Sequence, residues 1–113
     1  MTFSTALRLN MTGLAADPRE ESKRYRAAIE MAAFADARGF SVVSVEEHHC
    51  AENGWLPAPL LLAGMIVART QRVAVNVTAL LVPLYDPIRL AEDAALVDVL
   101  YLVPRPARAG LVA

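Results

Sequence analysis

Cysteine, histidine and aromatic residues are scarce in this chain of 113 residues, which has one cysteine, two histidines and 6% aromatic residues. The single cysteine, Cys50, excludes an internal disulfide and is typical of a reducing compartment, so we expect a cytoplasmic protein. The chain also lacks an excess of charge of either sign, because it has 11 basic and 12 acidic residues and a net charge of −1. This balance argues against nucleic acid as the main partner.

Long apolar segments are lacking too. The longest run, residues 56–68, contains two prolines and a glycine and stops at Arg69. It is shorter than the roughly 20 residues that span a bilayer. Arg8 and Asn10 interrupt the apolar stretch near the beginning of the chain, which therefore lacks the pattern of a signal peptide. We expect neither a membrane span nor a membrane partner.

What the chain has instead is an alternation of strand-like and helix-like segments. Strands are predicted at residues 3–11, 40–46 and 72–81. Helical periodicity follows each of them, at residues 18–38, at residues 58–70 and from residue 87 onward. This order predicts an α/β fold of three parallel strand–helix units joined by right-handed crossovers.

Local signals support these boundaries. Asp17-Pro18 and Asp86-Pro87 are typical helix starts, because aspartate caps free amides and proline suits the first helical position. Gly39 is predicted to end the first helix in the left-handed conformation. The apolar stripe of that helix includes either Phe34 or Ala35. The second strand has apolar side chains on both faces, which predicts that it is covered on both sides.

The second strand runs directly into Glu46, Glu47, His48 and His49. The carboxyl ends of parallel strands open onto a crevice or barrel mouth, so this is the candidate site. We predict His48 and Glu47 as the catalytic residues, the histidine for proton transfer and the glutamate as an orienter or a pocket carboxylate. Each has a structural alternative: a backbone hydrogen bond for the histidine, and a salt bridge to Arg89 or another cation for the glutamate.

Neighbouring side chains diverge at a strand end, so Glu47 and His49 should point away from His48. The group lacks the one-turn spacing of a zinc-binding helix, and we predict no metal site. Trp55 and Tyr85 are aromatic loop residues that either wall a substrate pocket or cover the core.

Two segments resemble the bacterial luciferase-like flavin monooxygenases. They are Glu47-His48-His49 and residues 82–93, Val-Pro-Leu-Tyr-Asp-Pro-Ile-Arg-Leu-Ala-Glu-Asp. The resemblance implies that residues 1–100 are the N-terminal portion of a (β/α)8 barrel, a truncated TIM-barrel-like fragment. It also implies FMN, or a deazaflavin, as the cofactor, and a small organic substrate that is oxidised with O2.

The resemblance assigns roles to single residues. His48 matches the catalytic histidine of the family, and Asn76, Thr78 and Ala79 match the strand end that lies against the flavin ring. Many members have a cis peptide bond where Thr78–Ala79 stands, and we expect a trans bond here because the neighbours that enforce it would be missing.

Residues 101–113 depart from the family pattern, in which a Ser-Gly-Gly-Arg-like turn and a fourth strand follow. Two prolines and scattered arginines do not suit a central strand, so we expect a non-family tail on a truncated or frameshifted product. The late-barrel loops that hold the flavin phosphate would then be missing. We expect the isolated chain to be inactive, to bind FMN weakly and to self-associate into a homo-oligomer through exposed apolar surface.

Two other functions stay open. In the first, the chain is a non-catalytic remnant or a half-barrel interaction module. In the second, it is a hydrolase or lyase that uses His48 and Glu47. The sequence has no Gly-x-Ser-x-Gly motif, which weakens the hydrolase interpretation.

Overall fold

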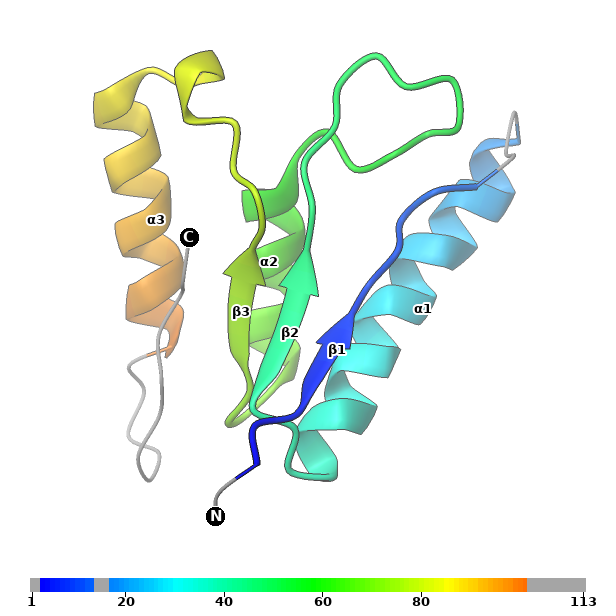
Figure 1. The fold of residues 1–113 in the computed structure, drawn as a ribbon, viewed down its shortest axis with the longest axis vertical. Helices are drawn as coiled ribbons and strands as arrows, with labels where there is room; N and C mark the ends of the chain where they lie inside the picture. Colours follow the sequence, from blue (N-terminus) through cyan, green and yellow to red (C-terminus); the bar gives the residue numbers. More distant parts are fainter. Residues whose placement is uncertain (1–2, 14–16, 102–113) are drawn as a thin grey trace.

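The computed structural model describes residues 3–13 and 17–101, which form a three-stranded sheet and a layer of helices (Figure 1). In chain order the elements are β1 (Ala6–Arg8), α1 (Pro18–Ala37), β2 (Val42–Val45), α2 (Pro59–Arg69), β3 (Ala74–Val77), the 3₁₀ helix η1 (Val82–Leu84) and α3 (Pro87–Tyr101). This order confirms the three predicted strand–helix units. The expected tail lies outside the described residues, except that Tyr101 is the last residue of α3.

The three strands are parallel and lie in the order β1-β2-β3. Ala6 pairs with Val42, which in turn pairs with Ala74, so the carboxyl ends of the strands meet at one edge of the sheet. The paired ladder is shorter than the predicted strands. Single hydrogen bonds continue beyond it, for example from the Thr78 amide to the Val45 carbonyl (2.8 Å).

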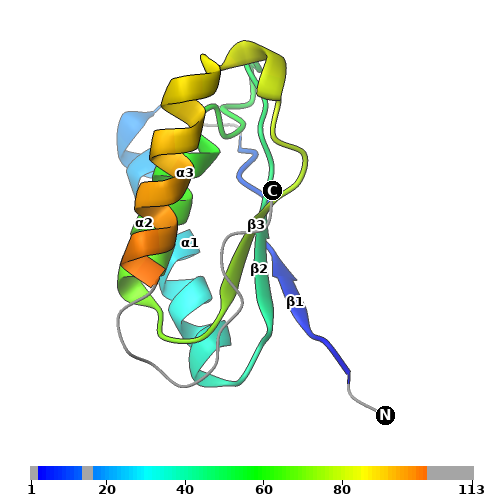
Figure 2. The ribbon, with the colours of Figure 1, turned by 90° about the vertical axis from the view of Figure 1, so that its left-hand side faces the viewer.

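All three helices lie on one face of the sheet (Figure 2). Crossovers of one hand between strands taken in sequential order place every helix on the same side. In β2, Val43 and Val45 are fully buried, whereas Val42 and Ser44, which alternate with them, are partly exposed. The prediction that β2 is covered on both faces is therefore wrong for the described residues.

The hydrophobic core lies between the sheet and the helices. Aliphatic side chains from the strands and from α1 and α2 make up most of it: Ala28, Ala32, Val43, Val45, Leu62, Ala63, Ile66, Val67, Val73, Val75 and Val77. In α1, Ala35 is buried and Phe34 is 56% exposed, so the apolar stripe runs through Ala35. No described helix combines the length and hydrophobicity needed to cross a membrane.

The helix boundaries follow the predicted signals. The Asp17 side chain accepts a hydrogen bond from the amide two residues on (2.9 Å). Asp86 accepts from the amides two and three residues on (3.0 Å each). Gly39 has a φ of +78° just after α1, a conformation that favours glycine.

Asp36, near the end of α1, fixes the turn before β3, a role that the sequence did not reveal. Its carboxylate accepts hydrogen bonds from the amides of Gln71 (2.8 Å), Arg72 (2.6 Å) and Val73 (2.7 Å). Burial opposes its ionisation, but these hydrogen bonds prevail and hold the pKa of the carboxyl below its ordinary value of 3.8.

Candidate active site

A cavity of about 350 Å³ opens at the carboxyl ends of the strands. Its lining comes from all three strand ends and from the loop between β2 and α2: Arg8, Glu46, Glu47, His48, Trp55, Thr78, Ala79 and Leu81. His48 and Thr78 thus lie at the same end of the sheet, which confirms the expectation that the strand ends converge on one site.

His48 stands at the wall of this cavity. Its imidazole stacks on Trp55, with ring centroids 3.5 Å apart and an angle of 29° between the planes. Its backbone amide donates to the carbonyl of Leu56 (2.9 Å), and this hydrogen bond does not involve the imidazole ring. The side chain is 40% exposed. An imidazole with one face covered and its edge open to a cavity can pass a proton to a bound molecule.

Glu46 and Arg8 form an ion pair beside His48. One carboxylate oxygen of Glu46 contacts the guanidinium, and the other lies 3.7 Å from Nε2 of His48. Sequence reasoning missed this pair. The available signal was a pair of opposite charges on neighbouring predicted strands, with Arg8 within the first strand and Glu46 at the end of the second.

Glu47 is buried, with 3% exposure, and its carboxylate joins three groups. Oε1 accepts from Tyr85 Oη (2.7 Å) and from His49 Nε2 (2.7 Å), and Oε2 accepts from the Leu81 amide (2.6 Å). Arg89 pairs instead with Asp93 (3.1 Å), so the suggested Glu47–Arg89 bridge is absent from the described structure.

The electrostatics of this cluster follow from its contacts. Burial opposes the ionisation of Glu47, but hydrogen bonds from Leu81, Tyr85 and His49 prevail and hold its pKa below the ordinary 4.5. Burial, and then the hydrogen bond to Glu47, raises the pKa of Tyr85 far above its ordinary value. The cluster therefore contains an ionised carboxylate and a neutral phenol.

The side chains alternate as predicted at this strand end. Glu46 pairs with His48, and Glu47 pairs with His49, each two residues apart. The side chains of Glu47 and His48 therefore have different contact partners. A catalytic role for either residue stays a prediction.

The predicted flavin-facing residues occupy two adjoining cavities. Thr78 and Ala79 border the cavity of His48. Asn76 borders a second cavity, of about 580 Å³, on the sheet face that the helices leave open; Thr78 lines both. The peptide bond between Thr78 and Ala79 is cis, so the expectation of a trans bond is wrong. Neighbours that hold this segment are present: the Val45 carbonyl accepts a hydrogen bond from the Thr78 amide, and the Glu47 carboxylate accepts one from the Leu81 amide.

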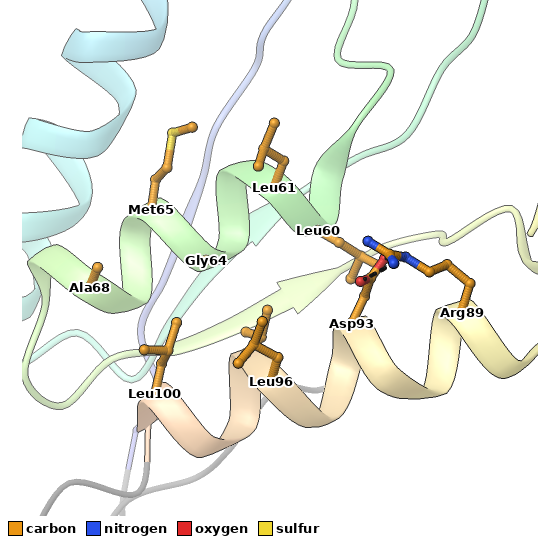
Figure 3. A pocket seen from close by; sticks show the side chains of 10 residues that line it. Leu60, Leu61, Gly64, Met65, Ala68, Arg89, Asp93, Leu96 and Leu100 are labelled. Carbon is orange, nitrogen blue, oxygen red and sulfur yellow. Dashed lines mark hydrogen bonds and ion pairs between the residues drawn. The ribbon is translucent and has the colours of Figure 1, made fainter.

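A third cavity, of about 440 Å³, lies between α2 and α3 (Figure 3) and shares no lining residue with the cavity of His48. Leucine side chains dominate it, and the Arg89–Asp93 pair lies at one end. We call it the α2–α3 groove; its lining is Leu60, Leu61, Gly64, Met65, Ala68, Arg89, Asp93, Leu96, Val97 and Leu100. Within the described residues, no three histidine, cysteine or acidic side chains gather in a way that could hold a metal ion.

Comparison with known proteins gives consistent matches. The alkanal monooxygenase beta chain of Photorhabdus luminescens is 30% identical over 69 residues, which are 61% of this chain and 21% of that protein. The oxygenase component of the flavin-dependent trigonelline monooxygenase of Acinetobacter baylyi is 27% identical over 84 residues, 74% of this chain and 23% of that one. This chain thus spans about a fifth of the length of these relatives.

The fold matches a solved structure as well. The oxygenating constituent of 3,6-diketocamphane monooxygenase from Pseudomonas putida, solved with FMN, superposes with a TM-score of 0.76 at 21% identity. The match covers 88% of this chain and 27% of that one. A sequence model described as luciferase-like monooxygenase matches residues 5–102. The chain therefore belongs to the luciferase-like monooxygenase family.

Proposed function

We propose that the cavity at the strand ends is part of the active site of a flavin-dependent monooxygenase, which uses reduced flavin and O2 to oxidise a small organic substrate. One observation carries this proposal: His48, stacked on Trp55, shares a cavity with the strand end at Thr78–Ala79. The names of both relatives support it, since both are monooxygenases and one is called flavin-dependent. The FMN in the neighbour of similar fold favours FMN over a deazaflavin.

The residues of the cavity fit the ring of a flavin. The exposed strand end at Thr78–Ala79 offers backbone edges, Trp55 offers an aromatic surface, and His48 offers an exchangeable proton. A phosphate needs amide or cationic donors. Among the described residues that line the cavity, the cation is Arg8, and it is paired with Glu46. We therefore assign only the ring-facing part of the site to these residues.

Each residue then has a physical task. A reduced flavin, when bound, supplies the electrons that activate O2. His48 holds or moves a proton at its Nε2 atom, and Trp55 shields one face of the imidazole from water. Glu47 is a positioning residue, because its three hydrogen bonds join the chain after β2 to the chain after β3.

Flavin titration tests the proposed cofactor site. We expect riboflavin and FMN to bind with similar affinity, because the assigned residues face the ring and not the phosphate. Trp55→Ala should weaken both by roughly tenfold. Phe34→Ala, which removes an exposed aromatic residue on α1, is the matched control and should leave both affinities unchanged. A lack of saturable binding of either flavin at millimolar concentration would contradict the proposal.

The role of His48 is tested by product formation. With reduced FMN, O2 and either an aldehyde or trigonelline, any product formation by the chain should be slowed by about 100-fold or more in His48→Gln. Glu92→Gln changes an exposed residue of α3 and should retain the rate. Mass spectrometry of the oxygenated product separates this reaction from the oxidation of free flavin. Equal and measurable rates of product formation in both variants would rule out His48 as the proton carrier.

Self-association is a second property that we propose, and the alternative function of an interaction module rests on it. The α2–α3 groove exposes large apolar side chains, with Leu61 at 65% and Leu96 at 61% exposure. Exposed apolar patches of this kind often mark association surfaces.

A further inference from the structure

Glu46 lies between the two side chains of the cavity that are able to carry positive charge. Its Oε1 atom pairs with the Arg8 guanidinium, and its Oε2 atom lies 3.7 Å from Nε2 of His48. The Glu46 side chain is only 14% exposed, whereas those of Arg8 and His48 are 72% and 40% exposed. Of these three side chains, Glu46 is therefore the most enclosed, and its carboxylate lies beside both the guanidinium and the imidazole.

The other charged groups near His48 are engaged elsewhere. Among the described residues that line the cavity, Glu47 is the second carboxylate, and it accepts hydrogen bonds from His49, Tyr85 and a backbone amide. The lining residues that follow β3, namely Thr78, Ala79 and Leu81, are uncharged. Trp55 covers one face of the imidazole. Glu46 is thus the carboxylate best placed to act on His48.

We propose that Glu46 is a positioning residue for His48, whose imidazole it holds against Trp55. Arg8 limits this effect because it shares the same carboxylate. A carboxylate oxygen attracts the ring N–H groups of a neighbouring imidazole, and an imidazole stacked on an indole gains from the contact between the two ring faces. When His48 gives up its proton to a bound molecule, Glu46 keeps its charge and takes no proton. Only the use of this proton in catalysis rests on the proposed function.

The fluorescence of Trp55 tests the contact directly. Trp55 is the only tryptophan in the chain, so its emission reports on the imidazole that it touches. A protonated imidazole quenches an indole in contact with it, so we expect the emission to fall as the pH is lowered. His48→Gln should abolish this step, while circular dichroism shows that the fold is retained. No flavin or O2 is needed, so this result is independent of the proposed function.

Substitutions on the two sides of the carboxylate should change the size of this quenching step in opposite directions. Glu46→Gln weakens the hold on the imidazole, so part of the quenching of Trp55 should be lost. Arg8→Met leaves the carboxylate to His48, so the quenching should increase. Glu30→Gln removes an exposed carboxylate that pairs with Arg69 and should leave the size of the step unchanged.

Three results would overturn the proposal. The first is a quenching step of identical size in wild type and Glu46→Gln. The second is a change in the same direction for Glu46→Gln and Arg8→Met, which a general loosening of the fold would cause. The third is a pH step that survives in His48→Gln, since Trp55 would then not contact that imidazole in solution. If one variant fails to fold, the direction of the change in the other still decides.

Discussion

At the scale of single residues, two buried carboxylates connect segments that are distant in the sequence. Glu47 joins the chain after β2 to Leu81 and Tyr85, more than thirty residues further on. Asp36 joins the end of α1 to the turn before β3. Hydrogen bonds to a charged, buried acceptor are among the stronger polar contacts in proteins, so both residues should matter for stability.

The first prediction concerns Glu47. Glu47→Gln replaces an acceptor-only group with one that also presents an NH2 donor, which faces three donors at this site. We expect the free energy of unfolding to fall by about 2 kcal/mol in urea denaturation. Tyr85→Phe is the comparison, because it removes one of the three hydrogen bonds and should cost about 1 kcal/mol. A larger loss in Tyr85→Phe than in Glu47→Gln would refute this ranking.

The second prediction concerns acid stability. The pKa of Asp36 is lowered by folding, so its contribution is present above the ordinary value of 3.8 and is lost as the pH falls through the folded pKa. At neutral pH, Asp36→Asn should be less stable than wild type by about 2 kcal/mol. This difference should narrow as the pH falls from about 5 to about 2. Urea denaturation at several pH values measures it, and a constant difference would contradict the role of the charge.

At the scale of elements, aspartate-proline pairs start α1 and α3. The third prediction is that Asp86→Ala lowers the free energy of unfolding by about 1 kcal/mol, because two amides lose their acceptor. Hydrogen exchange should speed up at the amides of Ile88 and Arg89. Glu92→Ala, one turn further along α3, is the control, and equal exchange rates in both variants would show that the cap is unimportant.

At the scale of the whole molecule, the helices cover one face of the sheet and leave the α2–α3 groove exposed (Figures 2 and 3). The fourth prediction is that two copies associate through this groove. Leu96→Lys should raise the dissociation constant at least about tenfold in sedimentation velocity, because a charge would be buried in the contact. Val99→Lys changes an equally exposed residue (59%) outside the groove lining and should have little effect. Equal behaviour of the two variants would exclude the groove as the contact.

The parts of the site differ in how far the sequence could predict them. The position of His48 follows from a valine-rich strand that ends in ionisable residues, and the divergence of Glu47 follows from strand alternation. The Glu46–Arg8 pair and the stack of His48 on Trp55 depend on how neighbouring strands and a loop approach each other in space. Local propensity carries no information on such distances, so these contacts emerged only from the structure.

The sequence by itself determined the three strand–helix units, their parallel order and the helix starts, because side-chain periodicity, capping and proline geometry act over a few residues. Only the tertiary structure decided which carboxylate lies beside which histidine, that the helices leave one face of the sheet open, and that Asp36 accepts hydrogen bonds from the turn before β3. These outcomes depend on register and on packing between segments more than thirty residues apart, where small shifts in space exchange one partner for another.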